Sequence, residues 1–283
     1  MQTGEAFFRT PDGLELYRHW WRPDGPSRGA VLLTHGFGEY SGHYYEALTN
    51  ALLARGFAVH AWDLRGHGRS PGRWGWVRNW REFTDDLAAL RKIVLAGEPG
   101  LPLFLFGHSM GAVIVLDHAE QAPEGIAGVA LTGPALGPST LVWWRELLAR
   151  SLDKLWASVQ ISAGLHVEAI SDIPEVQRFH ANDPSFHPIG TPRLAGEFER
   201  AKARVNAGAP QWRLPLFIQH GERDPIALPS GSRNFVAHCP PGDVTLLEIP
   251  AMPHHLLNCS CAEAVAGRIA EWMAERCAVK LPT

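Results

Sequence analysis

The chain has 283 residues, of which 46% are hydrophobic and 19% are charged, and this balance excludes intrinsically disordered and fibrous proteins. The formal net charge of −3 offers no attraction to phosphate backbones, so we expect no nucleic-acid partner. A chain of this length buries roughly three quarters of its unfolded surface on folding, which is enough for one large hydrophobic core.

The N-terminal residues and the cysteines bear on where the protein works. Residues 1–5 carry neither the basic nor the apolar part of a signal peptide, and no apolar run approaches the roughly 18–20 residues of a membrane span. The four cysteines, which lack the paired C-x-x-C spacing of zinc sites, are Cys239, Cys259, Cys261 and Cys277. We therefore expect reduced thiols, no bound metal and a cytoplasmic location. The alternative is a metal set in which His254 and His255 join these cysteines.

Short apolar runs alternate with segments of helical periodicity through most of the chain. The runs typical of strands are Ala6–Arg9, Leu14–Trp20, Ala30–Thr34, Ala58–Trp62, Pro102–Phe106, Gly128–Thr132, Leu216–Gln219 and Val244–Ile249. The segments typical of helices are Tyr44–Arg55, Glu82–Ala96, Met110–Gln121, Ser230–His238 and Cys261–Cys277. Because strands buried on both faces are continuously apolar, this alternation predicts an α/β fold whose eight-stranded sheet is mostly parallel and flanked by helices.

Two local patterns refine this prediction. The turn Pro11-Asp12-Gly13 joins the first two strands and predicts a hairpin at one edge of the sheet. At the start of the last helix, Ser260 and Glu263 have the spacing of a capping box. In this motif each of the two side chains accepts a hydrogen bond from the backbone N–H of the other residue.

One stretch interrupts the alternation, from about residue 139 to residue 212. It has no convincing buried strand, but it has a helical segment at Thr191–Asn206 and, before it, apolar residues at helical spacing. Those residues are Leu141, Trp144, Leu148, Leu152, Leu155 and Val159. Two helices within a long loop would explain the pattern, but we favour a helical cap because a structureless loop of this length is rare in a compact domain. The predicted core therefore has two parts, 1–138 and 213–283, with a cap at 139–212 between them.

The strongest chemical signal is the segment Gly107-His108-Ser109-Met110-Gly111. It follows a continuously apolar run and precedes a helical one, which is the strand–turn–helix context of a nucleophile elbow. Glycines on either side allow the sharp turn that lifts the serine hydroxyl clear of the sheet. We therefore predict that Ser109 is a nucleophile.

A nucleophilic serine needs a base, and the base needs a carboxylate to orient it. In this kind of fold, the acid follows a late strand and the histidine follows the last one. The turn after Leu216–Gln219 contains Asp224, which we prefer, and its rival Glu222. The loop after the last strand contains the adjacent residues His254 and His255, and both are candidates.

The loop Thr34-His35-Gly36-Phe37-Gly38-Glu39 is the candidate for the second half of an oxyanion hole. Two fixed backbone N–H groups stabilise an anionic oxygen better than mobile water does. We expect one such group from Met110, directly after the nucleophile, and the other from Phe37. The alternative is a glycine turn without a catalytic role.

Three motifs carry a resemblance to a known family. They are His35-Gly36-Phe37-Gly38-Glu39-Tyr40-Ser41-Gly42, Asp63-Leu64-Arg65-Gly66-His67-Gly68-Arg69-Ser70 and Gly107-His108-Ser109-Met110-Gly111. With Asn182-Asp183-Pro184 and Asp224, they resemble the monoglyceride lipase and lysophospholipase branch of the α/β-hydrolases over nearly the whole chain. The resemblance implies an esterase that acts on a lipid with a single acyl chain, with a cap that forms an acyl tunnel.

The resemblance also assigns the site. It places the family's serine on Ser109, its acid on Asp224 and its oxyanion donors on Phe37 and Met110. Its histidine fits best on His254.

Two departures from the family pattern leave a one-residue shift open. The glycine usually found three residues before the histidine is Ala251 here, and Pro253 directly precedes His254. His255 therefore stays as the alternative base.

Apolar residues in the expected cap are the candidates for contact with the acyl chain. They are Trp143, Trp144 and Leu148, and they could also touch lipid aggregates or a membrane surface. Packing within the cap would explain them almost as well. The run from Pro71 to Trp80 interleaves arginine with tryptophan, but in this family it resembles a loop after the fourth strand rather than a nucleic-acid surface.

Together these observations predict a serine carboxylester hydrolase that works through an acyl-enzyme on Ser109 and needs no metal or organic cofactor. Its expected partner is a small acyl ester. Hydrolysis of a thioester or an N-terminal peptide bond by the same residues is the nearest alternative. A binding protein that has lost catalysis is a further alternative, although none of the three expected catalytic residues is missing.

Overall fold

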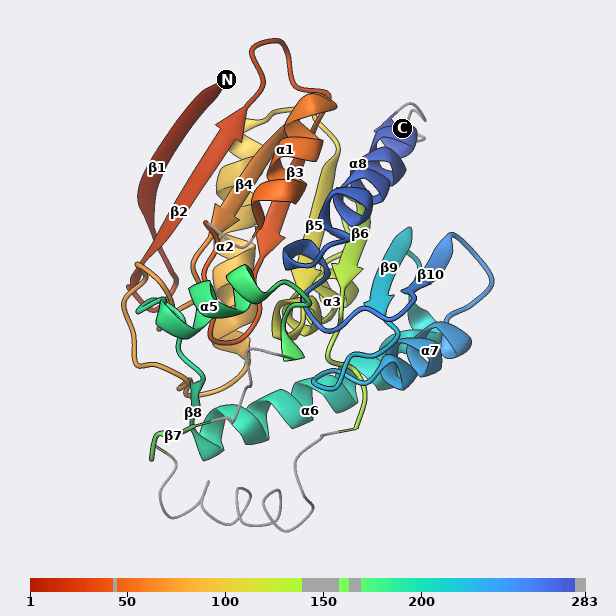
Figure 1. Cartoon of the computed structure of the whole chain (residues 1–283). Coiled ribbons are helices and arrows are strands. Elements are labelled where there is room, and N and C mark those ends of the chain that lie inside the picture. The colour runs from red at the N-terminus through yellow and green to blue at the C-terminus, as the bar shows by residue number, and fades with distance from the viewer. Residues whose placement is uncertain (43–44, 139–157, 163–168, 278–283) are drawn as a thin grey trace.

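The computed structural model describes residues 1–42, 45–138, 158–162 and 169–277, and its layers are shown in Figure 1. The strands of the main sheet are β1 (Gln2–Arg9), β2 (Glu15–Arg22), β3 (Gly29–Thr34), β4 (Phe57–Trp62), β5 (Leu103–His108), β6 (Ile126–Thr132), β9 (Leu216–Gly221) and β10 (Val244–Ile249). Their order across the sheet is β1-β2-β4-β3-β5-β6-β9-β10. Strand β2 is antiparallel to both of its neighbours, and the remaining pairs are parallel. The predicted α/β-hydrolase architecture is confirmed.

Burial explains which segments became strands. Every residue of β3, β4, β5, β6 and β9 is buried, as the continuously apolar runs predict. At the edge, β1 and β2 form the predicted hairpin, and most residues of β1 are exposed or half-buried. These five buried strands therefore sit at the centre, and the carboxyl ends of the parallel strands meet on one side of the sheet.

Helices cover both faces of this sheet. They are α1 (Glu46–Ala54), α2 (Arg81–Gly97), α3 (Met110–Gln121), α7 (Pro229–His238) and α8 (Ala262–Cys277). Helices α1 and α8 pack together on one face, and α2 and α3 pack together on the other, so that a hydrophobic core lies on each side. No helix among the described residues has both the length and the apolar character to cross a membrane.

The described part of the interrupting stretch lies at the carboxyl ends of the strands (Figure 1). Its elements are β7 (Ile161–Ser162), α5 (Pro174–Asn182), β8 (Ile189–Gly190) and α6 (Pro192–Gly208). Helix α6 matches the predicted helical segment, and the Thr191 hydroxyl caps it by accepting the Leu194 N–H at 3.2 Å. Trp143, Trp144 and Leu148, the expected cap residues, lie outside the described residues. Val159, at the end of the predicted apolar repeat, belongs to no helix and is exposed.

Helix α5 was not predicted, and the small antiparallel pair of β7 and β8 is likewise new. Of the residues in α5, His180 alone is buried, so little of this short helix packs into the core. It begins with Pro174 at its first turn, a position where the missing N–H of proline is harmless.

The predicted capping box at the start of α8 is wrong. Helix α8 begins at Ala262, and the Ser260 hydroxyl donates to Asp172 Oδ2 at 2.5 Å. The Ser260 N–H donates to the other oxygen of Asp172 at 2.9 Å. A long-range partner therefore replaces the local one, and it ties the start of α8 to the segment before α5.

The arginine- and tryptophan-rich run supports the interrupting stretch. The ring of Trp74 stacks on His187, with centroids 4.4 Å apart and planes 4° apart. The Trp80 ring is buried, and its backbone N–H donates to Glu197 on α6 at 2.8 Å. The Thr191 hydroxyl donates to the Gly75 carbonyl at 2.6 Å. These contacts therefore tie the run to the interrupting stretch and give Trp74 and Trp80 a structural role.

Candidate active site

Ser109 lies at the sharp turn between β5 and α3. Its φ of +52° falls in the left-handed region that residues with a side chain rarely adopt. The glycines around it are required by close packing. A Cβ atom on Gly107 would lie 2.6 Å from Ala112 Cα, and one on Gly111 would lie 2.3 Å from the His35 carbonyl oxygen. The motif thus builds the strained elbow that its sequence context predicts.

Three side chains from distant loops meet at this turn. The Ser109 hydroxyl lies 2.9 Å from His254 Nε2, and His254 Nδ1 lies 2.6 Å from Asp224 Oδ2. An ionised carboxylate only accepts hydrogen bonds, so Nδ1 carries the proton and Nε2 is free to accept the proton of the serine hydroxyl. The geometry is that of a serine nucleophile, a histidine base and an orienting acid.

Backbone groups and a second histidine hold Asp224. Its Oδ1 accepts the N–H groups of Ile226 and Ala227, both at 2.8 Å. Its Oδ2 also lies 3.1 Å from Nε2 of His220, whose Nδ1 faces the Ser232 hydroxyl at 2.8 Å. The role of His220 was not predicted from the sequence, although this residue stands only four residues before the acid. Its position at the carboxyl end of β9 was the signal that could have marked it.

The charges of this group support one another. Burial disfavours the charged form of His254, but the Asp224 carboxylate beside it and the charge of Glu39 outweigh burial and raise the pKa of His254 above its ordinary value. Burial would raise the pKa of Asp224, yet His254 and His220 hold that pKa well below its ordinary value. Asp224 therefore stays ionised and stabilises the imidazolium form of His254.

The two expected oxyanion donors lie at the same place. Phe37 and Met110 line one cavity together with Ser109 and His254. Among the described residues, neither the Phe37 N–H nor the Met110 N–H has a hydrogen-bond partner. The first N–H groups of a helix lack partners within it, which explains the free N–H of Met110. Both groups can therefore donate to an anionic oxygen that forms beside Ser109.

The described residues form a cavity of about 230 Å³ that opens on Ser109. Its lining is mostly apolar, with Phe37, Met110, Ala135, Ile170, Phe186, Leu194, Ala195, Phe198 and Ile226. Glu39 is the charged residue among the described lining, and its carboxylate accepts hydrogen bonds from the Gly36 N–H and the Tyr45 hydroxyl, both at 3.0 Å. Such a cavity suits an apolar group attached to the reacting carbonyl carbon.

Glu222 and His255, the alternative acid and base, have other partners. Glu222 is exposed, and its Oε2 accepts the backbone N–H of Ala251 at 3.1 Å. His255 is buried beside His254, and its Nε2 lies 3.2 Å from Oε1 of Glu39. The structure thus brings Ser109 together with Asp224 and His254 rather than with the rival pair.

Ala251 supplies a prediction about stability. Its φ of +61° is left-handed, which costs a residue with a Cβ atom about 1–2 kcal/mol, whereas glycine adopts it freely. We expect Ala251→Gly to raise the free energy of unfolding by up to about 1 kcal/mol in a urea titration, because the relief of strain exceeds the added chain entropy. The matched control is Ala203→Gly on the exposed side of α6, which should lower it by about 1 kcal/mol. A loss of stability in both variants would contradict this account of the loop.

The fold and the site together define a serine hydrolase of the α/β-hydrolase class. The chain belongs to the family described as serine aminopeptidase, S33, whose model matches residues 25–259. It is 31% identical over 277 residues to a monoacylglycerol lipase of Mycolicibacterium smegmatis, an alignment that covers 95% of this chain and 96% of that one. The resemblance stated from the sequence motifs is confirmed.

Two solved structures share the fold. One is a soluble variant of the monoglyceride lipase of Saccharomyces cerevisiae in complex with a substrate analogue, with a TM-score of 0.87 and 27% identity over 96% of this chain and 94% of that one. The other is the monoacylglycerol lipase of Paleococcus ferrophilus, with a TM-score of 0.82 and 29% identity over 98% of this chain and all of that one.

Proposed function

We propose that this serine hydrolase cleaves the ester bond of a monoacylglycerol or a similar lipid with a single acyl chain. The observation that carries the proposal is the apolar cavity that opens on the Ser109 hydroxyl. The relatives named monoacylglycerol lipases support the same substrate class. A single acyl chain would lie along the apolar wall, and its carboxyl carbon would lie at Ser109.

The side chains divide the reaction between them. His254 Nε2 takes the proton of the Ser109 hydroxyl while Oγ attacks the ester carbonyl carbon, and Asp224 stabilises the imidazolium that forms. The N–H groups of Phe37 and Met110 donate to the anionic oxygen of the tetrahedral intermediate. When the intermediate collapses, His254 gives its proton to the departing alcohol and an acyl-enzyme remains. Water then loses a proton to His254 and attacks this ester, which releases the fatty acid and restores Ser109.

The interrupting stretch at 139–212 has the role of a cap in this proposal. Helix α6 supplies Leu194, Ala195 and Phe198 to the cavity, which supports placement of the acyl chain beneath it. Trp143, Trp144 and Leu148 stay predicted contacts of the acyl chain. Contact of the cap with lipid aggregates and a cytoplasmic location likewise stay predictions.

A peptide substrate fits the cavity less well, although the family takes its description from an aminopeptidase. An enzyme that selects a free N-terminus needs an acid for the ammonium group, because a buried charge is costly without a partner. Glu39 is the acid in the described lining, and its oxygens already face Gly36, Tyr45 and His255. We therefore favour an uncharged ester.

The proposal is tested with p-nitrophenyl esters from acetate to palmitate, beside 1-monoacylglycerol, lysophosphatidylcholine, an acyl-CoA and an amino-acid p-nitroanilide. We expect kcat/KM to rise with chain length and monoacylglycerol to be cleaved. An optimum at acetate would contradict the acyl site, and turnover confined to acyl-CoA or the anilide would move the protein to thioesterases or aminopeptidases.

A pair of variants on α6 sharpens this test. Ala195→Trp should fill the cavity and lower kcat/KM for palmitate at least about tenfold more than for acetate. Differences in pocket size change the preference between a longer and a shorter substrate by about this factor. Ala203→Trp adds the same side chain on the exposed side of the helix and should leave the chain-length preference unchanged. Equal preferences in the two variants would show that the chain lies elsewhere.

The pH dependence follows from the pKa of His254. The base must be neutral to take the serine proton, and its pKa lies above the ordinary value of about 6.5. Activity is therefore present above this raised pKa and is lost as the pH falls through it. We expect kcat/KM for a soluble ester to fall on an acid limb centred above about pH 6.5, with circular dichroism showing that the fold persists. A flat profile down to about pH 5 would argue against a histidine base.

A further inference from the structure

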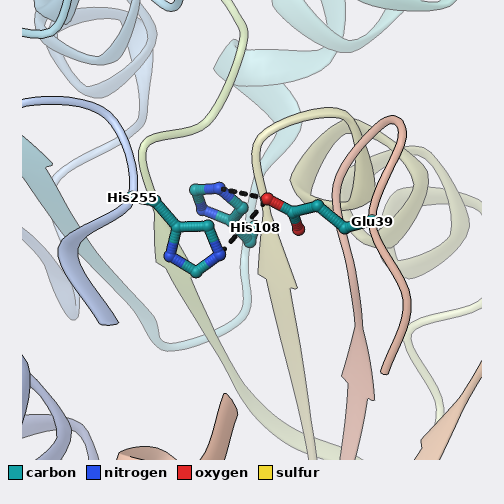
Figure 2. Close-up of side chains that lie close together, drawn as sticks. All are labelled: Glu39, His108 and His255. Atoms are coloured by element: carbon teal, nitrogen blue, oxygen red, sulfur yellow. Dashed lines mark ion pairs between the residues drawn. The ribbon is translucent and has the colours of Figure 1, made fainter. Parts of the chain in front are cut away.

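Three buried side chains meet close to the catalytic histidine, and Figure 2 shows them pointing toward one another. Glu39 comes from the loop after β3, His108 from the end of β5 and His255 from the loop after β10. Oε1 of Glu39 lies 3.2 Å from His255 Nε2 and 3.7 Å from His108 Nε2. The proposed ester chemistry uses none of the three as an acid or a base.

The His108 ring leaves one nitrogen without a partner. Its Nδ1 lies 3.0 Å from the Thr132 carbonyl oxygen, which can only accept, and 3.1 Å from the Thr132 hydroxyl, which can accept or donate. The shorter contact to the carbonyl favours Nδ1 as the donor. Its Nε2 is fully buried, points toward Glu39 and makes no hydrogen bond with any described residue. A buried nitrogen that faces a carboxylate without a proton between them lacks the partner that such groups normally have.

We propose that Glu39, His108 and His255 form a binding site for a divalent transition-metal ion such as Zn²⁺. Two imidazole nitrogens and one carboxylate oxygen are a ligand set that zinc prefers. Bonds of about 2.0–2.1 Å in a tetrahedral arrangement place neighbouring ligand atoms about 3.3–3.5 Å apart. The three ligand atoms all lie within 4.8 Å of one another, and the two separations from Glu39 already bracket that spacing.

The surroundings orient these ligands as metal sites require. The Thr132 carbonyl fixes the His108 ring through Nδ1, and the other oxygen of Glu39 is held by the Gly36 N–H and the Tyr45 hydroxyl. His255 now presents Nε2 to a carboxylate, so that nitrogen carries a proton. Binding requires this proton to move to Nδ1. The side-chain amide nitrogen of Asn258 lies 3.4 Å from Nδ1 and 3.3 Å from Nε2, so an amide flip would bring its oxygen within reach of a proton on Nδ1.

An ion reaches this site from the substrate cavity, because Glu39 lines that cavity together with Ser109. The ion would lie close to the base, since the ring centroids of His108 and His254 are 4.8 Å apart. During the reaction His254 becomes a cation, and a divalent cation nearby disfavours a second positive charge. The ion is therefore an inhibitor of the serine hydrolase rather than part of its chemistry.

The test begins with direct binding to the purified whole chain. Co²⁺, which takes the place of Zn²⁺, should bind in one equivalent and give the visible absorption of a tetrahedral complex, which added Zn²⁺ removes. Zn²⁺ should inhibit turnover of a p-nitrophenyl ester, and EDTA should restore it. His255→Gln removes a proposed ligand and should weaken Co²⁺ binding at least about 100-fold. Mutation of a group that only hydrogen-bonds a ligand already lowers metal affinity by about 10–100-fold. The binding arm needs no substrate, so it can fail independently of the proposed function.

Two controls separate this site from others. His238→Gln changes an exposed histidine, and Cys259→Ser with Cys261→Ser removes the thiols nearest the base loop; both proteins should bind Co²⁺ as the unmodified chain does. Circular dichroism checks that each variant is folded. Glu39→Gln removes a second proposed ligand and should also weaken Co²⁺ binding. Zn²⁺ inhibition that is equally strong in His255→Gln would place the ion on His254 and overturn the proposal. Absence of the tetrahedral absorption would overturn it as well.

Discussion

Ser109→Ala should fold like the unmodified protein and lose about 10⁴- to 10⁶-fold in ester turnover, which is the range observed when the serine of such a triad is removed. The loss is large because the acyl-enzyme cannot form without Oγ, while the oxyanion donors and the cavity remain. The fold should persist because alanine, like serine, has a single Cβ atom in the left-handed turn, where φ is +52°. Turnover is measured with a p-nitrophenyl ester, and the free energy of unfolding is measured with urea.

A matched control is Ser260→Ala, which removes an exposed serine hydroxyl that donates to Asp172. This variant should keep its turnover and lose only about 0.5–1.5 kcal/mol of stability. A fluorophosphonate probe should label the unmodified chain and Ser260→Ala at Ser109, and it should leave Ser109→Ala unlabelled. Near-normal hydrolysis by Ser109→Ala would exclude it as the nucleophile.

The features that could be predicted from the sequence are those that neighbouring residues decide. The central strands are continuously apolar because both of their faces are buried, so their positions follow from composition alone. The turn at Ser109 could be predicted because its glycines stand between such a strand and a helix. The predicted helical segment Thr191–Asn206 matches α6 to within two residues at each end.

The features that could not be predicted depend on long-range contacts. Glu263 was a suitable local partner for Ser260, yet the Ser260 hydroxyl donates to Asp172, which is 88 residues away in the sequence. The choice between Asp224 and Glu222 depends on how β9 and β10 align, because this alignment places Ala251 against Glu222 and His254 against Asp224. Local propensity contains no information about either contact.

The cluster of Glu39, His108 and His255 shows the same limit more strongly. Each residue stands in or beside a motif with another predicted role, and the pattern of the sequence does not reveal that the two imidazole rings and the carboxylate lie close together. They meet because β3, β5 and β10 end on the same side of a mostly parallel sheet. The topology therefore creates the cluster. In the sequence, Glu39 and His108 are 69 residues apart and His108 and His255 are 147 residues apart, so no local motif contains all three.

The adjacent histidines give the second large effect. His254→Gln should lower ester turnover to about the level of Ser109→Ala, because triad members act as a unit and their losses do not add. The amide of glutamine cannot take the serine proton at neutral pH, so the general base is lost. The variant that combines His254→Gln with Ser109→Ala should be no less active than either single variant. All three are compared with the same p-nitrophenyl ester.

His255→Gln is the matched variant, with the same substitution one residue further along. Its side chain can still donate to Oε1 of Glu39, which limits the cost of leaving that buried carboxylate without a partner. We expect turnover within about tenfold of normal and a lower free energy of unfolding, because His255 is fully buried between Tyr45 and His108. An inactive His255→Gln beside an active His254→Gln would shift the base by one residue. If both variants kept their activity, His108 would be the next candidate, although its Nδ1 faces Thr132 rather than Ser109 in this structure.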